Sequence, residues 1–280
     1  MDAQLKGKTA LVTGGTTGVG FHIALALAHE GAHVAVAARH SNQESVAAIQ
    51  ACGVRALEIE TDVSRPDQVI AMVQKTIAEF GRLDLYVNNA AVTHHQAFTQ
   101  ISAEAWQTTL NTNLAGCLWA CREVAKHMIL RQQGCILIVG STSMYTPGPS
   151  ETVYRITKMG LKALTQSLAI ELAPHQIRVN LLVPGHYRTK LTAGIPPETE
   201  ERLIHEIPLR RFGNLPECGH AAVLLLSDAL SAYTTGAELI VDGGLHLRAM
   251  TFLTDEALRD LNCGGLESLR GDAKREPPLL

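Results

Sequence analysis

Residues 9–29 read TALVTGGTTGVGFHIALALAH, and this stretch decides the fold. A short apolar run, Thr9–Val12, leads into a turn with four glycines, and an apolar segment of helical length, Gly18–His29, follows. A second apolar run, His33–Ala37, comes directly afterwards. Strand, glycine turn, helix and strand in this order predict a βαβ unit, in which the two strands are parallel.

The rest of the chain repeats this alternation of short and long segments. The further candidate strands are Ala56–Glu60, Leu85–Asn88, Ile136–Val139, Arg178–Val183 and Glu238–Val241. The further candidate helices are Pro66–Phe80, Ala103–Arg131, Val153–Ala173 and Pro216–Leu226. The strands are continuously apolar, which indicates burial on both faces. The sequence therefore predicts an α/β fold with a single Rossmann-type, doubly wound parallel sheet and helices on both faces.

Length and composition place this sheet in one domain. The 280 residues are 46% hydrophobic and 18% charged, which provides for a large buried core. No linker or shift in composition divides the chain before its last residues. We predict one domain over residues 1–244, with a flap-like segment at about 185–206, and a C-terminal extension over residues 245–280.

Charge and residue usage exclude several classes of partner. The formal net charge is -3 and no Lys/Arg cluster is present, which argues against nucleic acid or an anionic membrane surface. No apolar stretch approaches bilayer length, and the polar start of the chain lacks the features of a secretory signal. The scattered cysteines favour a reducing, cytoplasmic compartment. They complete no metal-ligand set, so no metal is expected.

The glycine-rich turn has the composition of a phosphate-binding loop. Glycines let the backbone approach a pyrophosphate, whose charge then lies on the free N–H groups of the helix N-terminus. We expect contacts to a dinucleotide from Gly14, Thr16, Thr17, Gly18, Val19 and Gly20. The flanking strand and helix supply the context that this motif requires.

The end of the second strand discriminates between dinucleotides. An NAD site usually has an acidic residue there, which binds the ribose hydroxyls. This chain instead has Arg39 followed by His40. An arginine can bind the 2′-phosphate of NADP as a planar, charge-assisted fork, whereas a carboxylate would repel it. The sequence therefore favours NADP(H) as the cofactor, and an NAD-preferring protein is the alternative.

A tyrosine and a lysine form a candidate acid/base pair. Tyr154 and Lys158 are four residues apart and share one face of a predicted helix. The pKa of a free tyrosine is about 10, and lowering it by about three units requires roughly 4 kcal/mol. One charge about 4 Å away, at an effective dielectric constant near 20, supplies about that much. We therefore expect Lys158 to lower the pKa of Tyr154.

Together these motifs resemble the short-chain dehydrogenase/reductase family over Lys8–Gly244, and in particular its members of the 3-oxoacyl-acyl-carrier-protein reductase and gluconate 5-dehydrogenase kind. The matching pieces are the glycine turn, Asp62-Val63, Asn88-Asn89-Ala90-Ala91, Asn113, Ser141, Tyr154 with Lys158, Pro184-Gly185, Pro208–Gly213 and Val241-Asp242-Gly243-Gly244. Ser141 lies thirteen residues before Tyr154, at the end of a candidate strand, as the serine of the family does.

The resemblance implies a role for each matching residue. Tyr154 would be the general acid in reduction and the base in oxidation, and Lys158 would bind the nicotinamide ribose. Ser141 would hold the substrate oxygen, and Asn113 would anchor a proton-relay water. The remaining cofactor-binding residues would be Asp62 and Val63 beside the adenine, Asn89, Ala90 and Ala91 along the cofactor, and Pro184, Gly185, Tyr187 and Thr189 near the nicotinamide.

Some positions depart from the pattern or leave it open. Ser143 is a second hydroxyl close to Ser141, so the serine could be assigned two residues later. Arg155 replaces a more usual small residue and bears on the substrate or on a neighbouring subunit. Glu151 could repel an anionic substrate or bind a hydroxyl, but it also fits a solvated rim.

The expectation is an NADP-dependent oxidoreductase acting on a small alcohol or carbonyl compound, with residues 1–244 as its catalytic domain and residues 185–206 as its substrate flap. By resemblance it is a homotetramer, and a dimer is the alternative. A non-catalytic nucleotide-sensing scaffold on the same fold is the rival from another class. Ketoacyl thioesters, sugars or sugar acids, steroids and small cyclic ketones are all compatible with the sequence.

Overall fold

The structure is a computed structural model that describes residues 2–189, 194 and 196–247. One compact unit extends to His246. The predicted extension over residues 245–280 lies outside the described residues from 248 on, and part of the predicted flap, residues 190–193 and 195, lies outside them as well.

A seven-stranded parallel sheet forms the centre of the molecule. Its strands are β1 (Thr9–Thr13), β2 (His33–Ala38), β3 (Ala56–Glu60), β4 (Leu85–Asn88), β5 (Gly134–Val139), β6 (Ile177–Pro184) and β7 (Glu238–Val241). Their order in the sheet is β3-β2-β1-β4-β5-β6-β7. The direction of winding therefore reverses between β1 and β4, which makes this the point where a ligand binds in such a sheet. The predicted fold class is confirmed.

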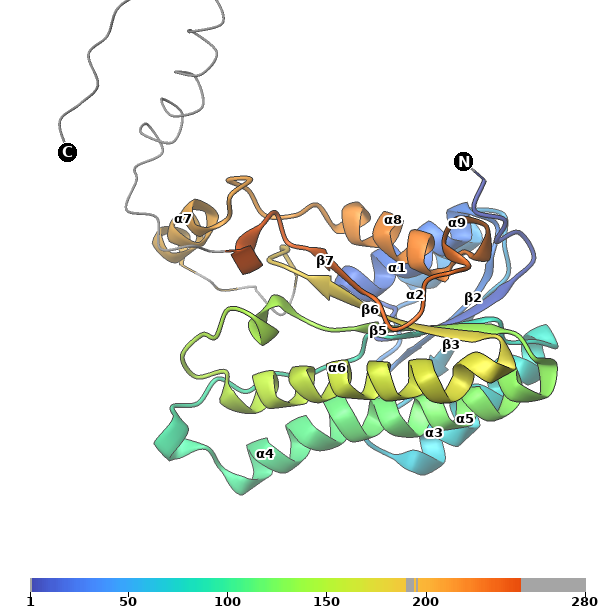
Figure 1. Ribbon diagram of the computed structural model, residues 1–280, viewed down its shortest axis with the longest axis horizontal. Helices are drawn as coiled ribbons and strands as arrows, with labels where there is room; N and C mark the ends of the chain where they lie inside the picture. Colours follow the sequence, from blue (N-terminus) through green and yellow to red (C-terminus); the bar gives the residue numbers. More distant parts are fainter. Residues whose placement is uncertain (1, 190–193, 195, 248–280) are drawn as a thin grey trace, which may run out of the picture. The chain divides into compact units, whose positions relative to one another are not determined.

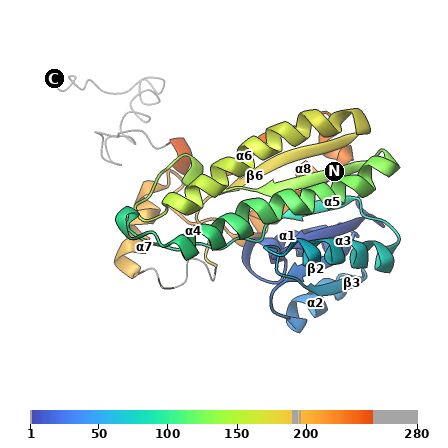
Figure 2. The same cartoon turned by 90° about the horizontal axis from the view of Figure 1, so that it is seen from below.

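Helices cover both faces of the sheet (Figures 1 and 2). On one face lie α1 (Gly18–His29), α2 (Gln43–Gln50), α8 (Leu215–Leu226) and the short α9 (Asp228–Ser231). On the other lie α3 (Pro66–Phe80), α4 (Ala103–Leu110), α5 (Gly116–Arg131) and α6 (Thr152–Leu172). A separate helix, α7 (Pro197–Glu206), falls within the predicted flap. The two faces bury separate apolar clusters, because the side chains of each strand alternate between them.

The long predicted helix over residues 103–131 is divided in the structure. A π-turn, Asn111–Ala115, separates α4 from α5. A π-turn inserts one extra residue into the helical repeat and is frequently found at functional sites. Its central residue is Asn113, whose side chain reaches the segment that follows β4.

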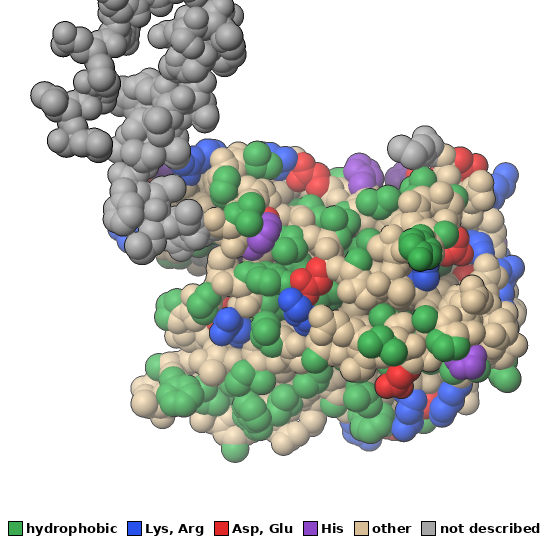
Figure 3. Space-filling model, viewed as in Figure 1, with side chains coloured by type: hydrophobic (Ala, Val, Ile, Leu, Met, Phe, Trp, Pro, Cys, Tyr) green, Lys and Arg blue, Asp and Glu red, His purple; other side chains and the backbone are tan. Residues whose placement is uncertain are grey.

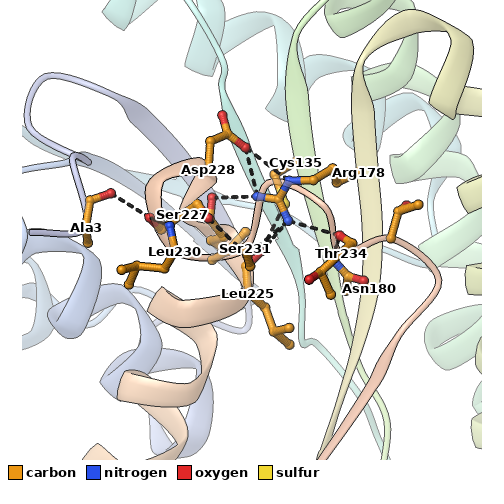
Figure 4. A network of polar contacts seen from close by, with 12 residues as sticks. Ala3, Cys135, Arg178, Asn180, Leu225, Ser227, Asp228, Leu230, Ser231 and Thr234 are labelled. Atoms are coloured by element: carbon orange, nitrogen blue, oxygen red, sulfur yellow. Dashed lines mark hydrogen bonds and ion pairs between the residues drawn. The ribbon is translucent and has the colours of Figure 1, made fainter. Parts of the chain in front are cut away.

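A buried arginine ties β6 to the segment around α9 (Figure 4). Arg178 is 8% exposed and donates to the carbonyls of Leu225, Leu226 and Thr234 at 2.8 to 3.3 Å. It also forms an ion pair with Asp228 at 2.9 Å. The charge of the guanidinium is thus compensated by one carboxylate and several carbonyls, as a buried cation requires. This network lies at the beginning of β6, at the opposite end of the strand from Pro184.

Within the part of the chain that the structure describes, none of the helices combines the length and the apolar character needed to cross a lipid bilayer.

Candidate active site

The predicted site residues gather at the carboxyl ends of the central strands. The glycine turn follows β1, Arg39 follows β2, Asn89 follows β4, Ser141 follows β5 and Gly185 follows β6. Parallel strands bring these ends to a single edge of the sheet.

The glycine turn packs too closely for side chains at three of its positions, Gly14, Gly15 and Gly20. A Cβ atom on Gly14 would lie 2.8 Å from Nδ2 of Asn89, and one on Gly20 would lie 2.3 Å from the same atom. Gly14 and Gly18 have φ values of 62° and 56°, a region that favours glycine. The N-cap residue of α1, Thr17, makes no side-chain capping bond, so the first N–H groups of the helix are available to an anion.

Asn89 braces this turn from the neighbouring strand. Its Nδ2 donates to the carbonyls of Thr13 and Gly14, each at 3.1 Å. The backbone N–H groups of Asn89 and Ala90 donate to Oγ1 of Thr13 at 3.0 and 3.2 Å. The side chain of Asn89 is therefore occupied in fixing the loop, and a contact of Asn89, Ala90 or Ala91 with a cofactor stays a prediction.

Two further segments border the turn. A Cβ atom on Gly18 would lie 3.4 Å from Cγ2 of Thr189, so Thr189 faces the start of α1. The Thr16 carbonyl accepts a hydrogen bond from the Asn42 amide at 3.0 Å, and the rest of Thr16 is buried. Val19, in the first turn of α1, packs against the apolar cluster on that face of the sheet.

Arg39 and His40 are both exposed after the end of β2. Within the described residues the guanidinium of Arg39 forms neither a hydrogen bond nor an ion pair, so its donors are open to a phosphate. The following loop is held by Glu58 of β3, which accepts from Ser41 Oγ at 2.7 Å and from Asn42 N at 2.6 Å. The contacts of Glu58 were not predicted from the sequence, because a charged residue within a strand does not indicate which loop it binds.

Asp62 and Val63 follow β3 in a turn that their own neighbours fix. Asp62 Oδ1 accepts from the backbone N–H of Ser64 at 2.9 Å, and Asp62 N donates to Gln68 Oε1 at 2.7 Å. Val63 is buried, and its carbonyl lies 2.6 Å from where a Cβ atom of Gly116 would stand.

Ser141 and Tyr154 meet across the loop between β5 and α6. Ser141 caps a 3-10 turn, Thr142–Met144, and its Oγ accepts from the backbone N–H of Ser143 at 3.2 Å. Burial raises the pKa of Tyr154 to about 12, and the charge of Glu151 raises it as well. A hydrogen bond with the Ser141 side chain lowers it. The structure thus couples Ser141 to the phenol. Ser143 Oγ, the alternative, has no hydrogen-bond partner among the described residues.

Lys158 lies under the tyrosine ring, with Nζ 5.5 Å from the ring centroid of Tyr154. Lys158 is 3% exposed, and its ammonium donates to the Val139 carbonyl at 2.9 Å. Burial lowers the pKa of Lys158 to about 8. The predicted lowering of the Tyr154 pKa is therefore not found in this structure, because desolvation of the phenol outweighs its favourable interactions.

Asn113 connects three elements around the site. Its Oδ1 accepts from Val92 N at 2.8 Å, and its Nδ2 donates to Val92 O at 2.9 Å and to Thr157 Oγ1 at 3.2 Å. Thr157 in turn donates to the Tyr154 carbonyl at 2.6 Å. The π-turn thereby joins the segment after β4 to the helix that carries Tyr154. This role of Thr157 was not predicted from the sequence, because a threonine between Tyr154 and Lys158 is expected on the surface of a helix.

The segment after β6 is closely packed at Gly185, and the Tyr187 side chain in it is buried between other segments of the protein. A Cβ atom on Gly185 would lie 2.6 Å from Cα of Asp242, so β6 and β7 meet tightly after the buried Pro184. The hydroxyl of Tyr187 donates to the Val241 carbonyl at 3.0 Å, and its ring lies against Gly213. The Tyr187 side chain thus packs between segments of the protein, and only its backbone is left for the predicted cofactor contact.

The charge of Glu151 acts on two ionisable groups, the Tyr154 phenol and the His186 imidazole. The charge of Glu151 raises the pKa of both Tyr154 and His186. Burial is the larger influence on His186 and brings its pKa below the ordinary value, which keeps the imidazole neutral at pH 7. In the described ranges, no group of three His, Cys, Asp or Glu residues is placed to hold a metal ion.

Comparisons with known proteins agree on one kind of relative. A family model described as Enoyl-(Acyl carrier protein) reductase matches residues 14–246. A 3-oxoacyl-acyl-carrier-protein reductase of Staphylococcus aureus is 34% identical over 243 residues, which cover 86% of this chain and 98% of that protein. An L-rhamnose 1-dehydrogenase (NAD(P)(+)) of Sphingomonas sp. is 36% identical over 249 residues, 87% of this chain and 98% of that one.

A solved structure of similar sequence is of the same kind. The crystal structure of a short-chain type dehydrogenase/reductase from Mycobacterium marinum superposes with a TM-score of 0.82 at 38% identity. The match covers 87% of this chain and 97% of that one.

Proposed function

The chain belongs to the short-chain dehydrogenase/reductase family of nicotinamide-dependent oxidoreductases, and on this premise we propose that it is an NADP-dependent enzyme acting on a small alcohol or ketone. The observation that carries the proposal is the arrangement of Ser141, Tyr154 and Lys158. The Ser141 side chain is near enough to the half-buried phenol of Tyr154 to lower its pKa, and the Lys158 ammonium lies under the ring of that phenol.

The glycine turn supports a dinucleotide. Side chains on Gly14 and Gly20 would collide with Asn89, so the loop is shaped for close backbone packing. The uncapped start of α1 offers N–H groups and the positive end of a helix dipole to a pyrophosphate. Arg39, exposed and without a protein partner in the described residues, is suited to a 2′-phosphate. The bound NADP(H) would supply or accept the hydride.

Side chains of the protein would supply the proton that accompanies hydride transfer. Ser141 Oγ accepts a hydrogen bond from Ser143 N, which leaves the proton of the hydroxyl available to the substrate oxygen. Because the pKa of Tyr154 is about 12, its phenol is protonated at neutral pH, the form that a reduction needs. Donation from Tyr154 would neutralise the oxygen as it gains negative charge. Lys158 would bind the nicotinamide ribose by its position on the same helix face.

The names of the relatives indicate the general class of substrate. One relative is named for a 3-oxoacyl group on acyl carrier protein and another for the sugar L-rhamnose. We propose that this chain acts on a hydroxyl or carbonyl group of a small molecule.

An exposed apolar surface supports the proposed homotetramer or dimer. Figure 3 shows hydrophobic side chains along the edge of the molecule where α4 and α6 lie. Ile156, Met159 and Ile170 follow one another along α6 at helical spacing, and Ile170 is 78% exposed. Such a stripe is typical of a protein interface. We also propose a cytoplasmic location, on the ground that the cysteines are scattered and show no disulfide framework in the sequence.

Replacing Tyr154 by Phe tests the proposed function. Tyr154→Phe removes the proton donor and keeps the ring, so turnover should fall by at least about 10²-fold while NADPH binding persists. Turnover is followed by NADPH absorbance over a panel of ketones and alcohols, and binding by NADPH fluorescence.

Tyr233→Phe is the matched control, because Tyr233 is fully exposed and distant in sequence from the site. Near wild-type turnover by Tyr154→Phe would refute the role of the phenol. Tight NADPH binding without turnover of any compound by the wild-type protein would favour a nucleotide-sensing scaffold.

A further inference from the structure

The residue next to the catalytic tyrosine holds the loop of the catalytic serine. Arg155 follows Tyr154 on α6, and its Nε donates to the Ser143 carbonyl at 2.9 Å. Its Nη2 donates to the Met144 carbonyl at 3.2 Å. One guanidinium thus binds two consecutive carbonyls, and two parallel hydrogen bonds fix the orientation of that backbone more firmly than one would.

These carbonyls need a donor that the loop cannot supply. Ser143 and Met144 lie in the 3-10 turn, Thr142–Met144, whose last carbonyls have no partners within the turn. A cation at such a C-terminal end is favourable. Glu151 is one turn earlier on the chain, at a spacing suited to an ion pair, but the guanidinium of Arg155 contacts the carbonyls instead.

Ser143 connects the guanidinium to the catalytic hydroxyl. Its carbonyl accepts from Arg155, while its amide N–H donates to Ser141 Oγ at 3.2 Å. That bond occupies a lone pair of the Ser141 oxygen and so sets the direction of its proton. The Ser141 side chain in turn lies close enough to Tyr154 to lower the pKa of its phenol.

We propose that Arg155 is a positioning residue for the reaction, which aligns the Ser141 hydroxyl with Tyr154 by clamping the backbone at Ser143 and Met144. This inference rests on the proposed function of Ser141 and Tyr154. Arg155 touches neither reacting group itself. It acts through Ser143, and its loss lets the serine turn away from the phenol.

A double-mutant cycle in the full-length protein tests this coupling. Arg155→Met keeps the aliphatic stem and removes the donors, and a misplacement of about 1 Å at a catalytic group costs about 10²-fold in kcat. We expect such a loss with little change in KM or in the Kd for NADPH, and partial recovery in Arg155→Lys. In a Ser141→Ala background the same change should have almost no further effect, because residues that act as a unit are not additive.

Arg122→Met is the matched control, since Arg122 is a half-exposed arginine on α5 that pairs with Glu123. It should leave kcat unchanged. Multiplicative losses from Arg155→Met and Ser141→Ala would overturn the proposal, as would an effect confined to KM, which would make Arg155 a substrate contact.

A measurement without turnover separates this proposal from the proposed function. The chain has five tyrosines, so ¹³Cζ-tyrosine labelling gives few NMR signals, and Tyr154→Phe assigns the signal of Tyr154. The Tyr154 signal should move in Arg155→Met as it does in Ser141→Ala, and stay in place in Arg122→Met. An unmoved signal in Arg155→Met would overturn the clamp even if the protein proved to have no ketone substrate.

Discussion

Around Tyr154, burial, one neighbouring hydroxyl and one charge shift the pKa of the phenol in different directions. Burial raises its pKa to about 12, the hydrogen bond with Ser141 lowers it, and the charge of Glu151 raises it. In oxidation the phenol must lose its proton to act as a base, so the rate of that reaction rises with pH through the pKa of Tyr154. The neighbours of the phenol thus control the pH range of each direction.

Glu151→Gln removes the charge that acts on the phenol without changing the shape of the side chain. Because the Glu151 charge raises the pKa of Tyr154, the pKa falls in the variant. The rising limb of kcat/KM for alcohol oxidation should therefore move to lower pH. Glu104→Gln, an exposed carboxylate on α4, should leave the profile in place. A limb that moves to higher pH, or stays put in Glu151→Gln, would contradict this assignment.

Arg39→Ala tests the choice between the two dinucleotides. A hydrogen-bonded charge pair contributes about 1.5–3 kcal/mol, so the Kd for NADPH should rise by at least about tenfold and that for NADH should stay near its original value. Fluorescence titration of both cofactors measures the difference. Arg55→Ala, whose guanidinium pairs with Glu79 elsewhere on the surface, is the control. Equal weakening of both cofactors would assign Arg39 to structure instead of to the phosphate.

The sequence predicted which of the proposed site residues lie together better than it predicted their contacts. The spacing of Tyr154 and Lys158 places them on one helix face, and the family resemblance placed Ser141 beside them. The electrostatic expectation for Tyr154 failed, since it counted the charge of Lys158 and left out the desolvation of the phenol. The clamp by Arg155 depends on carbonyl directions in a short loop, which residue spacing does not encode.

At the scale of elements, the strands were easier to predict than the helices. Continuous apolar runs identify buried strands, and β3, β4 and β7 have the bounds that the sequence predicted. The helix α2 was missed, since its eight residues are mostly polar and small and it depends on capping by Asn42. The π-turn at Asn111–Ala115 was missed as well, because one inserted residue leaves the apolar pattern of the flanking helices almost unchanged.

Arg178 shows how one side chain fixes an element. Arg178→Met fills similar volume but leaves the carbonyls of Leu225 and Leu226 without their donor, and each unsatisfied buried group costs about 1–3 kcal/mol. The free energy of unfolding should fall by about 3 kcal/mol, measured as a lower urea midpoint at unchanged slope. Arg65→Met, at an exposed arginine beside Asp67, should change it by less than about 1 kcal/mol. Equal midpoints for the two variants would show that the network adds little.

On the scale of the whole molecule, the apolar stripe on α6 predicts the assembly. Ile170→Glu places a charge in the proposed contact between copies, at its most exposed residue, so it should shift the protein from an oligomer to a monomer in light scattering after size exclusion. Ala47→Glu, on the exposed side of α2, is the matched control and should keep the oligomer. A wild-type protein that is already monomeric would contradict the predicted tetramer or dimer.

The first described residues share an apolar cluster with α8. Ala3 and Leu5 are buried with Ala222, Leu225 and Leu226, and the Ser227 hydroxyl donates to the Ala3 carbonyl at 2.7 Å. During synthesis, Ala3 must therefore wait for Ser227, 224 residues later, before this face of the sheet can close. Nascent chains that stop short of α8 would expose the β1–α1 surface, which makes them natural clients for chaperones.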